Sequence, residues 1–378
     1  MNTHRARRAK ILLVAGARPN FIKISPILRA FEARRFALEP VLVHTGQHHT
    51  DAMSGVFFRE LDIPKPDIQL TPNKNGNSPP SQIAAIMAAF EPVVLSQRPD
   101  WVMVVGDVNS TVACALTANK LGVKVAHVEA GLRSFDRSMP EEINRICTDV
   151  ASDILFCSET SGINNLHKER IAGWGRKAFE VGSVTADAVS QHLPKAVRMR
   201  TATAFGLNPK SYALATFHRP AVVDTCAGLK NMIALVKSMG HFCPVIFPMH
   251  PRTRINLHRY GLWNQLNDAD KETVRITSPI GYLDFVSLMH TARFVVTDSG
   301  GVQEETTALG VSCFTFRDNT ERPATCQIGT NLIVGTDPHK AATSIGRAIK
   351  HQRRIPKRPR NWDGHAAERI ASIMEAQR

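Results

Sequence analysis

The sequence predicts an α/β protein of two domains with a cleft between them. Strand-like apolar runs alternate with helical stretches along the whole chain, and many of the runs are continuous in Val, Ile and Leu. Such runs are typical of parallel strands that helices cover on both faces. A usual domain has about 150 residues, so a chain of 378 residues fits two domains better than one.

Each half of the chain contains four expected strands with helices between them. In the first half the strands are expected at 11–17 (ILLVAGA), 39–46 (EPVLVHTG), 101–107 (WVMVVGD) and 123–131 (VKVAHVEAG), and the helices at 21–35 and 110–122. In the second half the strands are expected at 212–218, 243–250, 293–301 and 312–316, and a helix at 227–240. The pattern loosens near 186–210, so the expected domains are 1–190 and 191–360, with the C-terminal helix of 361–378 joining the first.

Composition and charge exclude several classes of protein. Hydrophobic residues make up 43% and charged residues 21%, which excludes a disordered or collagen-like chain, and no apolar run reaches the ~18 residues of a membrane span. The net charge of +14 would suit nucleic acid, but ten basic residues lie within 5–10 and 350–360, without interleaved aromatic residues. A net charge of about +4 remains on the rest of the chain, so we expect solvated surface charge or a small anionic substrate, with no nucleic-acid and no membrane partner.

Seven cysteines without a CxxC pair indicate reduced thiols in a cytoplasmic protein.

Polar motifs follow the expected strands, at the edge where open parallel sheets bind ligands. Gly16, Arg18 and Lys23 follow the first strand, and two cations beside a helix N-terminus suit an anion or the hydroxyls of a sugar. A glycine turn with two surface cations explains the same residues equally well.

A second motif lies at 298–305, where a strand ends in Asp-Ser-Gly-Gly and a helix begins with Val-Gln-Glu-Glu. Glycines let a ligand approach the backbone, and free N–H groups and the helix dipole favour a phosphate or pyrophosphate, with a downstream acid for ribose hydroxyls. The motif is neither a P-loop nor a GxGxxG fingerprint, so no nicotinamide cofactor is indicated. The plainer explanation is a Ser cap with a glycine turn.

Carboxylates and histidines lie at five other strand ends or loops. They are Asp107, Glu129 and the pair Glu141–Glu142, together with His218 and His250. Each one alone is better explained as a core or capping group, but five such ends converging on one cleft suit general acid/base chemistry. No pair has a metal-ligand spacing such as HxxxH, so no metal is assigned, and a dispersed three-ligand site stays open.

These stretches resemble the non-hydrolysing branch of the UDP-N-acetylglucosamine 2-epimerase family, from Ile11 to about Gly335. The landmarks occur in the family's order: GARPNFIKISPI, HTGQHHTDAM, VVGDVNST, HVEAGLRSFDRSMPEEINR, FPMHPRT, PIGYLDF, TDSGGVQEETTALG and RDNTERPAT. The resemblance implies the GT-B fold, in which two Rossmann-like domains hold UDP against the C-terminal one and the sugar towards the N-terminal one. It also implies interconversion of UDP-GlcNAc and UDP-ManNAc by elimination of UDP to 2-acetamidoglucal and re-addition. No cofactor is implied, and the implied form is a homodimer serving cell-surface polysaccharide synthesis.

The resemblance further implies roles for individual residues. Asp107, Glu129 and Glu141 resemble the carboxylates that act at C2, and His218 resembles the histidine near the leaving diphosphate. The implied substrate contacts are Arg18, Lys23, Gln47, Arg145, His250, Phe285 on the uracil side, Ser299, Gly300 and Gly301 on the diphosphate, Glu305 on the ribose, and Arg322. Which carboxylate is the base and which the acid is left open.

The chain departs from the family pattern at three places. The frequent HRxEN motif reads His218-Arg219-Pro220-Ala221-Val222, the GN motif reads Gly182-Ser183, and Ala324 replaces the Glu that usually follows TERP. A modified UDP-HexNAc therefore stays compatible. The alternatives are a hydrolysing epimerase that gives ManNAc and UDP, a glycosyltransferase on the same fold, a non-catalytic nucleotide-sugar sensor, and a nucleic-acid binder. Retention of the three carboxylates favours the epimerase.

Overall fold

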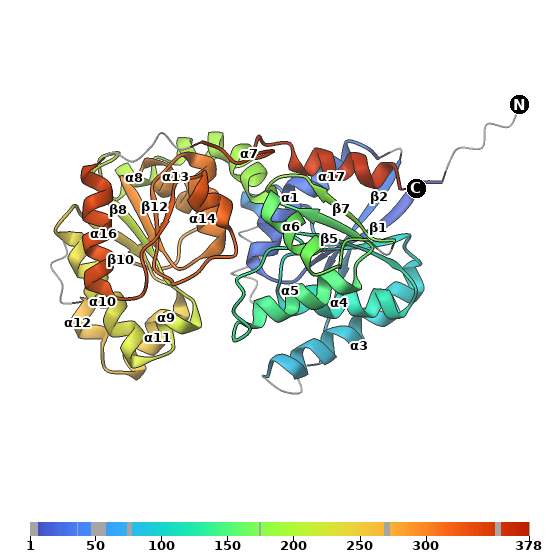
Figure 1. Ribbon diagram of the computed structural model, residues 1–378, viewed down its shortest axis with the longest axis horizontal. Coiled ribbons are helices and arrows are strands. Elements are labelled where there is room, and N and C mark those ends of the chain that lie inside the picture. Colours follow the sequence, from blue (N-terminus) through green and yellow to red (C-terminus); the bar gives the residue numbers. More distant parts are fainter. Residues whose placement is uncertain are drawn as a thin grey trace, which may run out of the picture. The chain divides into compact units, whose positions relative to one another are not determined.

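A computed structural model describes residues 7–35, 37–46, 58–73, 78–173, 175–267, 273–351 and 357–377. The chain divides into two compact units: unit 1 is Met1–Gln191 with Arg360–Arg378, and unit 2 is His192–Pro359. Each unit contains one parallel sheet with helices on both of its faces (Figure 1). The predicted α/β fold with two parallel sheets is confirmed. No helix in the described ranges has the length and apolar character needed to cross a membrane.

Unit 1 has a seven-stranded sheet in which neighbouring strands run parallel. In sheet order its strands are β3 (Ile68–Gln69), β2 (Leu38–His44), β1 (Ala9–Ala15), β4 (Trp101–Val105), β5 (Lys124–Val128), β6 (Ile154–Cys157) and β7 (Lys177–Glu180). Its helices are α1 (Arg18–Glu32), α3 (Pro79–Gln97), α4 (Asn109–Lys120), α5 (Pro140–Ala151), α6 (Thr160–Lys168), α17 (Ala366–Glu375) and the first part of α7 (Val184–Met199).

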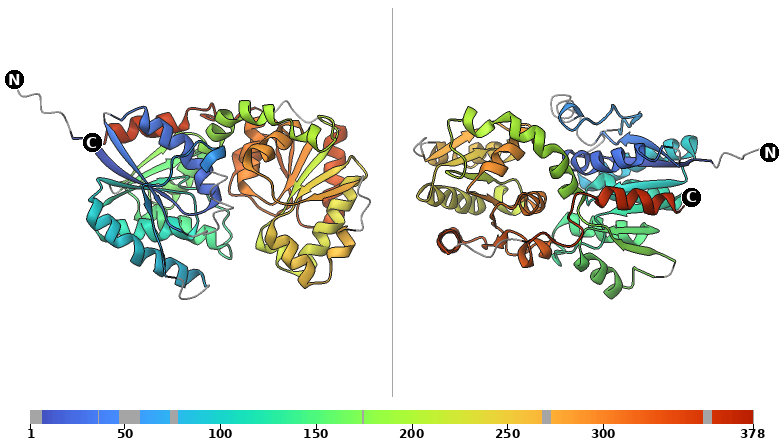
Figure 2. Two further views of the ribbon diagram at one scale, coloured as in Figure 1. Left: turned by 180° about the vertical axis from the view of Figure 1, so that it is seen from behind. Right: turned by 90° about the horizontal axis from the view of Figure 1, so that it is seen from above.

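Helices cover both faces of this sheet because its strands are apolar on both sides. α1 and α17 lie side by side over one face, and α4 and α5 lie over the other (Figures 1 and 2). Leu12 and Val14 of β1, with Val102 and Val104 of β4, pack against α3 and α4 in one core cluster. The residues between them point to the opposite face, as alternate residues of a strand do.

Unit 2 has a six-stranded parallel sheet. In sheet order its strands are β10 (Val274–Thr277), β9 (Val245–Pro248), β8 (Ala213–Thr216), β11 (Phe294–Thr297), β12 (Cys313–Thr315) and β13 (Asn331–Ile333). Besides the end of α7, its helices are α8 (Thr201–Ala204), α9 (Pro220–Val223), α10 (Cys226–Gly240), α11 (Pro251–Arg259), α12 (Trp263–Asn267), α13 (Tyr282–Thr291), α14 (Gly300–Leu309), α15 (Pro323–Gln327) and α16 (Pro338–Lys350). Two clusters, one on each face of the sheet, form its core.

The C-terminal helix docks on unit 1 through buried hydrogen bonds. The N–H of Ala367, in the first turn of α17, donates to the carboxylate of Asp187 at 2.7 Å. Just before α17, the indole N–H of Trp362 donates to the carbonyl of Ser158 at 2.8 Å. Burial raises the pKa of Asp187 to about 6.

Two helices begin earlier than the sequence predicts. The helix expected from residue 21 begins at Arg18, because Pro19 has the fixed φ that suits the first turn of a helix. The helix expected from Val302 begins at Gly300, so the two glycines expected in a turn lie in the first turn of α14. The strand expected at 11–17 is β1, which ends at Ala15.

Candidate active site

Unit 1 gathers polar side chains at the carboxyl ends of β1, β4 and β5. The side-chain oxygen of buried Asn20 accepts a hydrogen bond from the N–H of Ala17 at 2.9 Å, and its amide donates to the carbonyl of Val105 at 2.7 Å. Asn20 thereby ties the loop after β1 to the end of β4. In that loop a Cβ on Gly16 would lie 2.2 Å from the Oγ of Ser110, so the close approach requires glycine.

Lys23 and Glu129 form a buried ion pair at this edge. The Nζ of Lys23 lies 2.6 Å from Oε2 of Glu129, and the two side chains are 10% and 1% exposed. A Cβ added to Gly106, directly after β4, would lie 3.5 Å from Lys23 Nζ and 3.7 Å from Glu129 Oε2, so the pair lies over the end of β4. Glu129 has a φ of 71°, a conformation that costs a residue with a side chain about 1–3 kcal/mol and is frequent at functional sites.

Asp107 pairs with Arg145, which lies on α5. The Arg145 side chain is 1% exposed and that of Asp107 is 22% exposed. Among the described residues, Nε and Nη1 of Arg145 have no hydrogen-bond partner. A buried donor without a partner costs about 1–3 kcal/mol. These two N–H groups therefore mark a place where a polar or anionic ligand would be stabilised.

The neighbours Glu141 and Glu142 differ in their surroundings. Glu142 is buried and accepts hydrogen bonds from the N–H and hydroxyl of Ser134 at 2.8 and 2.9 Å, and from the N–H of Phe135 at 3.1 Å. It therefore fixes the loop that precedes α5. Glu141 is only partly buried and lies one helical turn before Arg145, on the same face of α5.

A buried charge network lies beside these carboxylates. Asp149 on α5 contacts Nδ1 of His127 at 2.7 Å, accepts from the N–H of Gly131 at 3.1 Å and pairs with Arg133 at 2.7 Å. Nε2 of His127 lies 2.9 Å from the carbonyl oxygen of Gly106. Burial alone would raise the pKa of Asp149, but His127 and Arg133 lower it below its usual value.

In unit 2 the buried Asp298 organises the end of β8. Its carboxylate accepts hydrogen bonds from the N–H groups of His218 at 3.0 Å and Arg219 at 2.9 Å, and lies 3.4 Å from Nδ1 of His218. The ring of His250 lies 5.8 Å from that of His218, and its Nδ1 accepts from the N–H of Arg252 at 3.2 Å. The two predicted histidines are therefore brought together, and His250 also caps α11.

The first turn of α14 holds Gly300 and Gly301. Ser299 is the N-cap residue, but its side chain makes no capping hydrogen bond, so the Ser cap that would explain the motif plainly is not present. A helix N-terminus leaves N–H groups without helical partners and favours an anion. A Cβ on Gly300 would lie 2.5 Å from Nη1 of Arg322, whose Nε donates to Glu304 at 2.8 Å.

The carboxylate of Glu321 forms ion pairs with three arginines near this turn. Its buried carboxylate lies 3.2 Å from Arg219, 3.0 Å from Arg317 and 3.7 Å from Arg322. Burial opposes the charge, but Arg219 and Arg317 hold the pKa of Glu321 well below its usual range. The ionised Glu321 therefore fixes guanidinium groups, which bind phosphate oxygens well, beside a helix N-terminus.

Glu305 lies on α14 and Phe285 on α13. Burial and the neighbouring Glu305 carboxylate raise the pKa of the Tyr282 hydroxyl well above its usual range. Phe285, on α13, is partly buried against the core cluster of that face. Gln47 lies outside the described residues, as does the side chain of Arg18, whose backbone begins α1.

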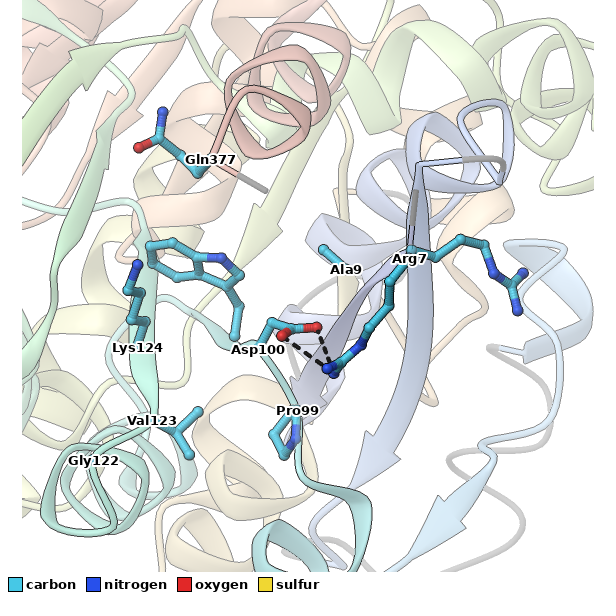
Figure 3. Close-up of a pocket in the computed structure, with 10 residues that line it drawn as sticks. Arg7, Ala9, Pro99, Asp100, Gly122, Val123, Lys124 and Gln377 are labelled. Atoms are coloured by element: carbon cyan, nitrogen blue, oxygen red, sulfur yellow. Dashed lines mark hydrogen bonds and ion pairs between the residues drawn. The ribbon is translucent and has the colours of Figure 1, made fainter. Parts of the chain in front are cut away.

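Two cavities of unit 1 lie away from all of these residues. One, of about 410 Å³, is lined by Arg7, Trp101 and Lys124 among others, and Arg7 lies 3.3 Å from Asp100 there (Figure 3). The other, of about 510 Å³, includes Phe179 and residues of α17. Across the described ranges no three His, Cys, Asp or Glu side chains are grouped as metal ligands.

Sequence analysis did not select several residues that build these strand edges. They are Asn20, His127, Arg133, Asp149, Glu304, Arg317 and Glu321. Helical spacing could have found Asp149, because it lies four residues after Arg145 and eight after Glu141. The others depend on partners that the sequence does not bring together.

Two parallel-sheet units with polar strand ends define an α/β enzyme of the GT-B-like class. A similar structure is that of the Methanocaldococcus jannaschii UDP-GlcNAc 2-epimerase in complex with UDP-GlcNAc and UDP, with a TM-score of 0.89 and 38% identity over 97% of this chain and 99% of that chain. The family model for UDP-N-acetylglucosamine 2-epimerase matches residues 29–375. The chain belongs to the UDP-N-acetylglucosamine 2-epimerase family, which confirms the resemblance.

Two relatives carry different substrate names. The UDP-N-acetylglucosamine 2-epimerase of Methanococcus maripaludis is 37% identical over 97% of this chain and 98% of its own length. The UDP-2,3-diacetamido-2,3-dideoxy-D-glucuronate 2-epimerase of Pseudomonas aeruginosa is 39% identical over 97% of this chain and 99% of its own length. Overall identity therefore does not distinguish the two substrates.

Proposed function

We propose that this chain catalyses reversible epimerisation at C2 of a UDP-N-acetylhexosamine, interconverting UDP-GlcNAc and UDP-ManNAc. The observation that carries the proposal is the edge of unit 1, where Asp107 and Glu129 each pair with a buried cation. Family membership supplies the class of substrate.

The proposed reaction is an elimination followed by re-addition. A carboxylate takes the proton from C2, the electrons of the C2–H bond form a C1–C2 double bond, and the C1–O bond breaks with its electrons leaving on UDP. UDP then adds back to C1 of the 2-acetamidoglucal while a proton reaches C2 on the opposite face. No oxidant or reductant is needed, because the atoms and electrons balance.

The surroundings of the carboxylates support this chemistry. Inversion at C2 needs a base on one face and an acid on the other, so two carboxyl groups must hold different protonation states. Asp107 has a guanidinium partner and is partly open to solvent, whereas Glu129 has an ammonium partner and is almost completely buried. Asp107 and Glu129 follow the neighbouring parallel strands β4 and β5, so two carboxylates with different partners and different burial lie at one edge of the sheet. Glu141, on α5, supplies a third carboxylate.

In this proposal unit 2 binds the UDP group and stabilises its departure. Charge develops on the diphosphate as the C1–O bond breaks, so fixed donors and cations aimed at it lower the barrier. Such groups are supplied by the N-terminal turn of α14 and by Arg322 and Arg219. His218 lies at the same edge of the sheet, because it follows β8 and contacts Asp298 after the neighbouring strand. Glu305 is proposed for the ribose and Phe285 for the uracil.

A modified UDP-HexNAc is the second candidate substrate. The Pseudomonas aeruginosa relative named for UDP-2,3-diacetamido-2,3-dideoxy-D-glucuronate is as similar to this chain as the Methanococcus maripaludis one. In addition, Val222 replaces the Asn of HRxEN and is buried in the core of unit 2, so it offers no polar contact there.

Proton NMR of the enzyme with UDP-GlcNAc in D₂O tests the proposal. UDP-ManNAc with deuterium at C2 is the expected product. Free ManNAc and UDP would instead indicate the hydrolysing reaction. No change at C2, followed by exchange with UDP-2,3-diacetamido-2,3-dideoxy-D-glucuronate, would select the modified substrate. If neither substrate exchanged its C2 proton, the result would contradict the epimerase and favour a sensor or a glycosyltransferase.

A further inference from the structure

Helix α5 presents one line of charged side chains to the loops of unit 1. Glu141, Arg145 and Asp149 are spaced four residues apart, so they follow one face of the helix over two turns. Arg145 pairs with Asp107, and Asp149 contacts His127 and Gly131. The proposed reaction uses the first two members of this line and leaves Asp149 unexplained.

Asp149 reaches both turns that carry a proposed acid/base carboxylate. Through His127 it is linked to the carbonyl of Gly106, the residue before Asp107. Its other oxygen accepts from the N–H of Gly131, two residues after Glu129. Gly131 has a φ of 75°, and a Cβ there would lie 2.3 Å from the carbonyl oxygen of Gly162, so this turn has little room to move.

Both ring nitrogens of His127 lie within hydrogen-bonding distance of an oxygen. Nδ1 lies 2.7 Å from Asp149 and Nε2 lies 2.9 Å from the carbonyl oxygen of Gly106, and the side chain is 0% exposed. Asp149 also contacts Arg133 and the N–H of Gly131, which fixes its carboxylate between the two turns. Arg133 in turn pairs with Glu169 at 2.7 Å, so the network extends to a second carboxylate.

A buried charged network is seldom the most stable solution, because well-packed apolar residues of similar volume are often as good or better. We propose that Asp149 and His127 are positioning residues for the reaction, which hold the Asp107 turn and the Glu129 turn at a fixed separation. This inference rests on the proposed C2 epimerisation. Neither residue needs to touch the substrate, because a displacement of about 1 Å at the reacting groups costs about 100-fold in rate.

A pair of amide variants isolates the contact to Gly106. In His127→Gln the side-chain nitrogen takes the place of Nε2 and reaches the Gly106 carbonyl, whereas in His127→Asn it takes the place of Nδ1 and reaches only Asp149. We expect kcat to fall about 100-fold in His127→Asn and in Asp149→Asn, and less than about tenfold in His127→Gln. The dissociation constant of UDP should change by less than about twofold in all three, since only positioning is lost.

Asp187→Asn is the matched control. Asp187 is another buried aspartate of unit 1, but its partner is the N–H of Ala367 in α17. Its replacement should change stability without changing kcat. If Asp149→Asn and His127→Asn keep the kcat of the wild type, or if His127→Gln is as slow as His127→Asn, the positioning role is wrong.

Nitrogen NMR of the wild-type protein supplies a readout that does not depend on the reaction. We expect a ring N–H of His127 and the amide N–H of Gly131 to exchange slowly in the wild type, and the amide of Gly131 to exchange faster in Asp149→Asn. Rapid exchange of both protons in the wild type would overturn the network even in an active enzyme. A wild-type enzyme that exchanges no C2 proton would overturn the proposed function instead, so the two failures are distinguishable.

Discussion

At the scale of single residues, the two units use charge in opposite ways. In unit 1 buried cations hold carboxylates, as Lys23 holds Glu129 and Arg145 holds Asp107. In unit 2 a buried carboxylate holds cations, since Glu321 lies within 3.7 Å of three arginines. In the proposed function the first arrangement supplies the groups that exchange protons, and the second supplies the groups that bind phosphate oxygens.

Removal of single carboxylates tests the proton-transfer role. We expect Asp107→Asn, Glu129→Gln and Glu141→Gln each to lower turnover by about 100-fold or more, because acid/base groups contribute on that scale. UDP binding, measured by calorimetry, should largely survive. Glu91→Gln, an exposed position on α3, serves as the matched control. Wild-type turnover in all three variants would remove these residues from the mechanism.

The two adjacent glycines of α14 make a second comparison at this scale. Gly300→Ala would force a Cβ to within 2.5 Å of the Arg322 guanidinium, whereas Gly301→Ala would meet nothing nearer than Ser299 Oγ at 4.0 Å. Overpacking costs about 1–3 kcal/mol, so thermal unfolding should show a destabilised Gly300→Ala protein. Gly301→Ala should unfold at or slightly above the wild-type temperature. Equal unfolding temperatures for the two variants would show that Arg322 moves aside freely.

At the scale of elements, a titrating carboxyl group, that of Asp187, is one of the contacts that hold α17. The pKa of Asp187 is raised from 3.8 to about 6 by burial, so the folded protein binds more protons than the unfolded chain between these values. Stability should therefore fall as the pH rises from about 4 to 6, by up to about 3 kcal/mol. Denaturant unfolding at several pH values measures this slope. Asp187→Asn should flatten it, and an unchanged slope in that variant would assign the pH dependence to other groups.

Strands and helices were predictable where the apolar pattern is long and regular. β4, β8 and α4 lie within two residues of their expected bounds, because buried parallel strands need continuous apolar runs. The start of α14 was not predicted, because two glycines were assigned to a turn, whereas in the structure both lie in the helix and Gly300 lets Arg322 pack against it. The link from Asp149 to Gly106 was not predictable either, since it depends on the pairing of β4 with β5.

At the scale of the whole molecule, each unit carries one part of the proposed chemistry. Binding of UDP without a sugar should therefore affect the units unequally. We expect hydrogen–deuterium exchange with UDP to slow most in unit 2, around the first turn of α14 and residues 217–219, where a ligand would occupy N–H groups and arginines. The segments that carry Asp107 and Glu129 should change less. Protection confined to unit 1 would contradict the proposed division of roles.

Sequence patterns located the motifs, but they did not show what each motif contacts. HVEAGLR contains both His127 and Glu129, and helical spacing places Asp149 on the face of Glu141, but neither pattern shows that His127 and Asp149 meet. That contact depends on how α5 packs beside β5.

The line of side chains on α5 has a consequence for insertions and deletions. One residue added between Glu142 and Arg145 would rotate the rest of the helix by about 100° relative to its first turn. Arg145 and Asp149 could then not face their partners while Glu142 kept its own. The spacing within this helix should consequently tolerate no change in length, whereas the exposed part of the preceding loop, around Arg137 and Ser138, should accept one.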